Sequence, residues 1–93
     1  MAGADDFARF AAAAAAAGYD ETQVRDWPAA AVVDQHDHPF AVLARVVAGE
    51  MWLTAEGATR HLRPGDEFTL AAGQPHAERY GASGATYWVA RRH

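Results

Sequence analysis

The chain has 93 residues, no cysteine and a formal net charge of −4. This length fits one small domain, and the lack of cysteine excludes disulfide bonds and thiolate ligands. The acidic balance gives no electrostatic footprint for nucleic acid, and because all eight basic residues are arginine, lysine Schiff-base chemistry is excluded.

An alanine-rich segment opens the chain. Residues 4–17 predict one helix, because alanine is the best helix former, Asp5 or Asp6 can cap its start and Gly18 can end it. The longest apolar run, seven alanines within this helix, is too short to cross a bilayer. Acids also stand where a signal peptide carries basic residues. We therefore expect a cytoplasmic protein with no membrane partner.

Short segments rich in β-branched and aromatic residues follow this helix. The predicted strands are residues 31–36, 40–47, 51–55, 58–62, 67–70, 76–80 and 85–90. Glycine-containing breaks separate them, including turns expected at Ala48–Glu50 and Gly81–Gly84. Many short strands between evenly spaced turns are typical of an antiparallel sandwich or barrel. We expect a helical segment over residues 1–22 and an all-β domain over residues 23–93.

Two of the five histidines stand close together, at His36 and His38. Successive side chains of a strand point to opposite faces, so these two imidazoles share a face while Asp37 points away. At that spacing they can bind one cation, but two solvent-exposed histidines at a strand end would look the same. The pair by itself leaves both interpretations open. His61, on a strand before a turn, is interpreted as solvent-exposed.

A second motif lies downstream, where a Pro-Gly-Asp turn, a short strand and a glycine-containing turn precede a further histidine. Together the two motifs resemble those of the cupin superfamily, G(x)5HxH(x)3–4E(x)6G and G(x)5PxG(x)2H(x)3N. The matching residues are His36, His38, Gly49, Gly65, Gly73 and His76. The resemblance covers about residues 27–91. It implies an antiparallel cupin β-barrel, or jelly-roll sandwich, after one N-terminal helix.

The sequence departs from this family at several positions. The family's glutamate ligand would fall at Val42 or Leu43, neither of which can bind a metal, while Ala71 replaces a proline and Tyr80 an asparagine. The resemblance therefore implies a metal site formed by three residues alone: His36, His38 and His76.

Such a site has chemical consequences. Three neutral imidazoles leave a divalent cation with its full charge and with open positions, which favours a small anionic, oxygen-rich ligand. Imidazole suits several transition metals, so iron, zinc, nickel, manganese and copper all stay open. If strand parity continues from Phe40 to Val46, alternate apolar side chains line the pocket beside the ligands. Tyr80 and Tyr87 are candidate acid–base residues, unless they are buried tyrosines with satisfied hydroxyls.

Several functions fit these features. Resemblance to three-histidine cupins implies a metal-dependent enzyme with dioxygenase-type chemistry, and lyase or isomerase action is equally compatible. The second class is a non-catalytic module that binds a small molecule or senses a metal. A third is a structural barrel that has lost its metal. Because small barrels leave strand edges exposed, we also expect a homodimer.

Overall fold

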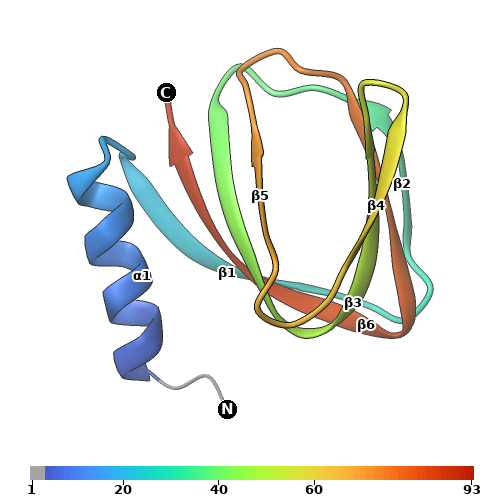
Figure 1. The fold of residues 1–93 in the computed structure, drawn as a ribbon, viewed down its shortest axis with the longest axis horizontal. Coiled ribbons are helices and arrows are strands. Elements are labelled where there is room, and N and C mark those ends of the chain that lie inside the picture. The colour runs from blue at the N-terminus through green and yellow to red at the C-terminus, as the bar shows by residue number, and fades with distance from the viewer. Residues whose placement is uncertain (1–3) are drawn as a thin grey trace.

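Two long strands, β3 (Ala41–Ala55) and β6 (His76–Arg92), organise the fold. The computed structural model describes residues 4–93. The other elements are α1 (Ala4–Ala16), β1 (Glu21–Trp27), β2 (Val32–His36), β4 (Ala58–Leu62) and β5 (Glu67–Leu70). Figure 1 shows the strands wrapped into a barrel-like body, with α1 standing outside it near the C-terminus. The structure thus confirms a mainly antiparallel β fold with one helix.

The strand pairing explains the two layers of this body. The first half of β3 pairs with the second half of β6, and these two are flanked by β5 and β1. The second half of β3 pairs with the start of β6, and these two are flanked by β4 and β2. Because β3 and β6 both bend midway, each contributes to both layers. All of these pairings are antiparallel, as expected of a jelly-roll sandwich.

The turns expected within β3 and β6 are wrong. Both segments continue as strands through their glycines, with register shifts between Val46 and Met51. The reason is close backbone contact: a Cβ on Gly49 would lie 2.1 Å from the carbonyl oxygen of Gly84, and one on Gly84 would lie 2.1 Å from that of Trp27. Both glycines also have positive φ, 72° and 73°. Glycine here bends two crossing strands and does not end them.

One strand was not among the predicted segments. β1 pairs with β6 from Glu21↔Arg91 to Trp27↔Ala85. Its polar sequence, ETQVRDW, gives a weak strand signal because one face of it is largely solvated. This strand matters for the pocket, because it brings Arg25 and Trp27 beside β6.

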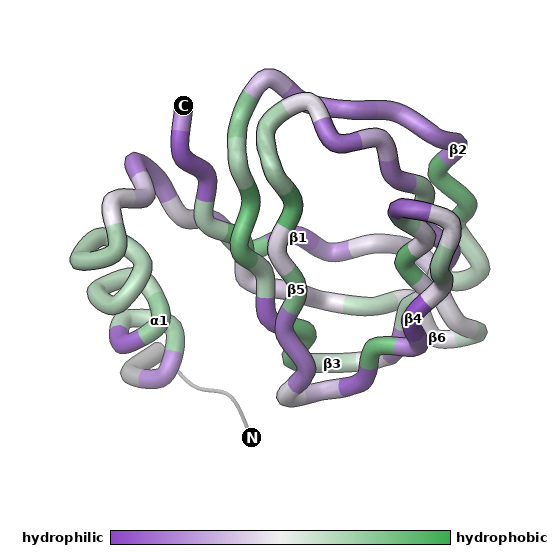
Figure 2. Tube along the Cα trace, turned by 45° about the horizontal axis from the view of Figure 1, so that its top comes forward, coloured by the Kyte–Doolittle hydropathy of each residue, from purple (hydrophilic) through white to green (hydrophobic). Residues whose placement is uncertain are grey.

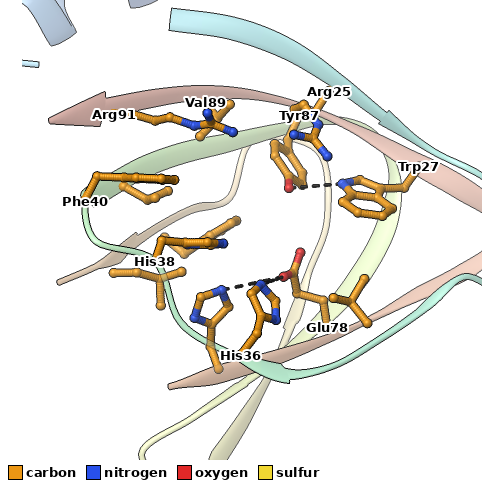
Figure 3. Close-up of a pocket in the computed structure, with 14 residues that line it drawn as sticks. Arg25, Trp27, His36, His38, Phe40, Glu78, Tyr87, Val89 and Arg91 are labelled. Carbon is orange, nitrogen blue, oxygen red and sulfur yellow. Dashed lines mark hydrogen bonds and ion pairs between the residues drawn. The ribbon is translucent and has the colours of Figure 1, made fainter. Parts of the chain in front are cut away.

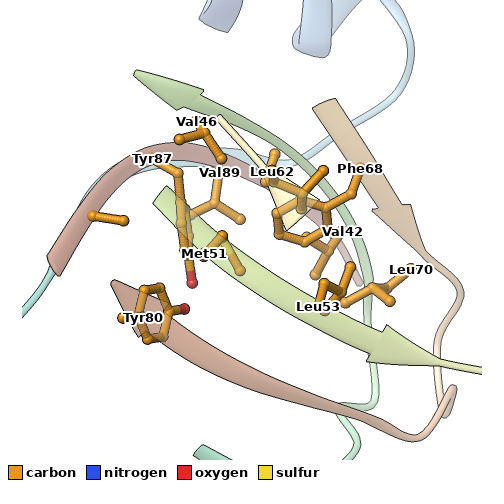
Figure 4. Packing of buried hydrophobic residues seen from close by; sticks show 12 residues of the cluster. Val42, Val46, Met51, Leu53, Leu62, Phe68, Leu70, Tyr80, Tyr87 and Val89 are labelled. Carbon is orange, nitrogen blue, oxygen red and sulfur yellow. The ribbon is translucent and has the colours of Figure 1, made fainter. Parts of the chain in front are cut away.

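The main core lies between the two layers, as Figure 4 shows. It contains Val42, Ala44, Val46, Met51, Leu53, Leu62, Phe68, Leu70, Tyr80, Ala85, Tyr87 and Val89. Val42, Ala44 and Val46 all point inward, so the parity expected along β3 is confirmed. In Figure 2 a hydrophilic stretch runs from the end of β2 toward β3 across one end of the barrel. The histidine pair lies in this stretch.

The helix packs on the outer face of β6. Trp88 points away from the main core, and the rings of Phe7 and Phe10 lie 5.5 Å and 5.8 Å from it. The helix ends one residue before the predicted boundary. Gly18, at φ 97°, donates to the carbonyl of Ala15 and Tyr19 donates to that of Ala14, which is the Schellman pattern. No helix within residues 4–93 combines the length and hydropathy that a bilayer crossing requires.

Candidate metal centre

The fold brings the three predicted histidines together. His36 ends β2 and faces His76, the first residue of β6, as its register partner. His38 lies two residues beyond β2, and its carbonyl accepts a 2.7 Å hydrogen bond from the amide of Gly73. This bond ties the histidine loop to the glycine turn that precedes His76. The candidate ligand nitrogens of the three imidazoles all lie within 4.8 Å of one another.

Backbone contacts orient two of these imidazoles. The Nδ1 atoms of His36 and His76 lie 2.8 Å and 2.9 Å from the carbonyl oxygens of Asp34 and Gln74. A carbonyl only accepts hydrogen bonds, so each Nδ1 carries the proton. In the neutral ring, Nε2 is then left with a free lone pair. Such fixing of the ring through its second nitrogen is the usual arrangement around a metal-binding histidine.

A carboxylate that the sequence analysis missed completes the group. Glu78 is 8% exposed and lies two residues after His76 on the same face of β6. Its Oε2 lies 3.7 Å from the Nε2 atoms of both His36 and His76 (Figure 3). Its Oε1 accepts a hydrogen bond from the hydroxyl of Tyr80.

The three-histidine cluster expected from the sequence is present, and a buried carboxylate that the sequence analysis did not identify lies beside it in the same pocket. Val42 is apolar and lines the pocket, and Leu43 packs toward the helix, so neither supplies the missing ligand. The carboxylate comes from a different strand, at Glu78. The alternation His76-x-Glu78 was the signal that could have found it, since both residues share a strand face.

These residues fit a divalent metal. Atoms bound to one metal at about 2.0–2.2 Å lie about 3–4 Å from each other. The 3.7 Å separations in this group are within that range and are too long for a direct hydrogen bond. Two nitrogen lone pairs and a carboxylate facing one another would repel without a cation between them. In addition, Nδ1 of His38 is buried and lacks a hydrogen-bond partner in the described part of the chain.

The group opens into a pocket of about 130 Å³. Its walls are Arg25, Trp27, Val33, His36, His38, Phe40, Val42, Phe68, Leu70, His76, Glu78, Tyr87, Val89 and Arg91. Burial lowers the pKa of His38, and the neighbouring His76 and His36 lower it further. A lowered pKa keeps this imidazole in the neutral form that binds metals. The volume suits a ligand of on the order of ten non-hydrogen atoms.

The two candidate acid–base tyrosines occupy different places. Tyr87 lines the pocket, and its hydroxyl oxygen accepts a 3.0 Å hydrogen bond from Nε1 of Trp27. Tyr80 is 2% exposed, stacks on Trp27 and contacts Glu78 instead of the pocket space. Burial raises the pKa of both phenols, and the charge of Glu78 raises it further. Both hydroxyls therefore keep their protons at neutral pH.

His61 lies outside this site. It is exposed, as expected, and its Nε2 lies 2.6 Å from Oε1 of Glu50 on the outer surface. Its ring stacks on that of Trp52 at 4.6 Å. This second histidine–carboxylate pair lacks the converging imidazoles of the pocket.

Comparison with known proteins identifies the fold independently. The chain is 32% identical to the DMSP lyase DddQ from Ruegeria pomeroyi DSS-3 over 77% of its length, with a TM-score of 0.71. It covers 37% of that lyase. KdgF from Halomonas sp. matches with 22% identity, coverage of 77% and 67% of the two chains, and a TM-score of 0.67. A cupin protein from Bacteroides fragilis matches with 19% identity, coverage of 76% and 63%, and a TM-score of 0.66.

The likenesses to KdgF and to the cupin protein from Bacteroides fragilis show the fold alone. No curated protein matches the sequence. The family model described as the AraC-like ligand binding domain matches residues 24–91, which is most of the chain and contains all four residues of the candidate metal centre. The chain therefore belongs to the family of AraC-like ligand binding domains and is a small cupin.

Proposed function

We propose that His36, His38 and His76, together with Glu78, hold a divalent transition metal, and that the protein acts on a small molecule bound in the adjoining pocket. The observation that carries this proposal is the convergence of two nitrogen lone pairs and a buried carboxylate across 3.7 Å gaps. A metal bound there would polarise an oxygen atom of the substrate as a Lewis acid. Histidine and carboxylate ligands suit several transition metals, so the ligand set does not select one.

Lyase or isomerase chemistry fits the pocket best. Tyr87 faces the pocket as a protonated phenol, and because its oxygen already accepts from Trp27, its own proton is available to a substrate. A group that transfers protons beside a Lewis acid is what elimination and isomerisation require. The 32% identity to a protein described as a DMSP lyase supports this class over the dioxygenase-type chemistry that the sequence also suggested.

Metal content tests the proposal directly. Protein purified without a histidine tag should contain up to one equivalent of transition metal by elemental analysis, or take it up when zinc, iron, nickel or manganese is added. The His76→Ala variant should lose this metal, while His61→Ala should keep it, because His61 lies outside the pocket. Wild-type protein that binds none of these metals would overturn the proposal. Elimination from small anionic, oxygen-rich molecules can then be assayed against oxygen consumption to separate lyase from dioxygenase action.

A second candidate function is a non-catalytic binding module. The family description, AraC-like ligand binding domain, favours it, because it names ligand binding alone. The two functions differ in what Tyr87 does. The Tyr87→Phe variant should lose turnover but keep ligand affinity in an enzyme. A binding module should show no turnover in the wild type with any ligand that binds.

A homodimer belongs to the same proposal. The two large hydrophobic side chains that are exposed in the described structure, Val24 at 49% and Val32 at 67%, lie on β1 and β2. Both strands flank β6 at the margins of the two layers. Pairing across a two-fold axis would cover such edges. Light scattering at micromolar concentration should give twice the 10.0 kDa chain mass, and a monomeric mass would contradict this assignment.

A further inference from the structure

Two arginines line the pocket on the side away from the candidate metal centre. Arg25 lies on β1 opposite Tyr87, and Arg91 lies four residues beyond Tyr87 on the same face of β6. Figure 3 shows both guanidinium groups along one side of the pocket, across from His36 and Glu78. The apolar side chain of Val89, which lies between Tyr87 and Arg91 on β6, also lines the pocket.

An aromatic ring holds each guanidinium in place. The Cζ atom of Arg91 lies 4.7 Å from the ring centre of Phe40, and that of Arg25 lies 5.1 Å from the ring centre of Trp27. Both rings line the same pocket. Stacking uses the flat face of a guanidinium and leaves its N–H edge available for hydrogen bonds. The aromatic contacts therefore position the two arginines without using their N–H donors.

The hydrogen-bond donors of this pair are in fact poorly satisfied. Nε of Arg91 is buried and has no hydrogen-bond partner in the described part of the chain, although one terminal nitrogen lies 3.5 Å from the half-exposed carboxylate of Glu21. For Arg25, the structure of residues 4–93 shows the Trp27 stack and no ion pair. Because the Nε donor of Arg91 is buried, leaving it without an acceptor is costly, and an acceptor supplied by a ligand would be favoured there.

The charges around the pocket indicate which ligand this is. The carboxylate of Glu78 in the same pocket and that of Glu21, 3.5 Å from Arg91, offset part of the positive charge of the two guanidinium groups, which favours a singly charged anion over a dianion. The planar edge of a guanidinium matches a carboxylate through two parallel N–H···O bonds. A dianionic phosphate would exceed the balance and would meet Glu78 and Glu21 across a small space.

We propose that Arg25 and Arg91 form a carboxylate-binding subsite, which holds the acid group of a small organic acid while its remaining atoms extend toward the histidines and Glu78. This inference rests on the proposed function in that it places the reacting end of the molecule at the metal centre. The subsite itself consists of this chain's arginines and needs no metal. Its ligand class is a small monocarboxylate, or a carboxylate with a second polar group at the far end.

Propionate and its neutral isostere propionamide test the subsite. Binding to the 93-residue chain, both zinc-loaded and treated with EDTA, can be followed by chemical-shift changes in 1H–15N spectra. Propionate should bind both forms, with propionamide at least about tenfold weaker. Arg91→Met and Arg25→Met, which keep an unbranched stem against the aromatic rings, should each weaken propionate binding about ten- to a hundredfold. Arg91→Lys should restore only part of the loss, because it lacks the planar fork.

Arg79→Met is the matched control. Arg79 also stacks on an aromatic ring, with Cζ 4.7 Å from the centre of Trp52, but it lies outside the pocket. Its replacement should leave propionate affinity unchanged. Equal affinities for propionate and propionamide, or equal losses in the Arg79 and Arg91 variants, would overturn the subsite. Tighter binding of inorganic phosphate than of propionate would overturn the choice of a carboxylate. A wild-type protein that takes up no zinc contradicts the proposed function, whereas the propionate result on EDTA-treated protein still decides the subsite.

Discussion

Replacing Glu78 by glutamine isolates the charge of the newly found carboxylate. The amide keeps the size of the side chain and an oxygen that can accept the Tyr80 hydrogen bond. It removes one negative charge that lies 3.7 Å from the Nε2 atoms of both His36 and His76. The variant should fold normally and bind divalent metal more weakly.

The size of this loss follows from Coulomb's law. A pair of unit charges about 4 Å apart is worth about 1 kcal/mol in water and about 4 kcal/mol at an effective dielectric constant of about 20. A metal-bound carboxylate oxygen lies about 2 Å from a dication, so the doubled charge and halved distance raise these values to about 4 and 16 kcal/mol. Because the side chain of His36 is 32% exposed, water reaches the site, and we use the lower value. About 4 kcal/mol corresponds to about a 1,000-fold larger dissociation constant.

Isothermal titration with zinc or nickel on metal-free protein measures this change. Glu50→Gln is the matched control, because Glu50 also pairs with a histidine, His61, but on the outer surface. It should leave affinity unchanged, while His76→Ala should abolish binding. Wild-type affinity in the Glu78→Gln protein, alongside lost binding in His76→Ala, would show that the carboxylate takes no part in the site.

Two further predictions concern stability. Gly84→Ala should lower the free energy of unfolding by about 1–3 kcal/mol more than Gly57→Ala does. Both glycines have positive φ, but only a Cβ at Gly84 would clash with backbone atoms. Equal losses of unfolding free energy in urea denaturation would contradict this close packing. Burial raises the pKa of Tyr80 and Tyr87, so above about pH 10 the unfolded chain releases protons that the folded protein retains, and stability should fall as pH rises through that range. The fall in stability with pH should be shallower in the Tyr80→Phe, Tyr87→Phe double variant when urea unfolding midpoints are compared from about pH 8 to about pH 11. An unchanged pH dependence of the midpoint would exclude these phenols as the source of the fall.

The sequence by itself determined the features that depend on neighbouring residues. Alanine propensity and Gly18 define the helix and its end, since helix formation and capping act within a few positions. Alternation along β3 correctly placed Val42 and Val46 on the inner face, because side-chain direction in a strand is local. The family motifs likewise brought His36, His38 and His76 into one hypothesis before the structure showed them converging.

The tertiary structure alone decided what depends on pairing between distant segments. Gly49 and Gly84 read as turns in the sequence, and only the crossing of β3, β6 and β1 shows why they are bends. The presence of a carboxylate beside the three histidines also depended on pairing between distant segments. Alternation along β6 puts Glu78 on the same face as His76, but which residues lie across from that face depends on the β2–β6 register.

The convergence of the two arginines has the same origin. Arg25 lies in a polar strand that local patterning did not reveal, and Arg91 lies 66 positions further along the chain, as the difference 91 − 25 gives. Only antiparallel pairing of β1 with β6 brings both to one side of the pocket. The sequence determined which chemical groups were present, whereas non-local register decided which of them share a site.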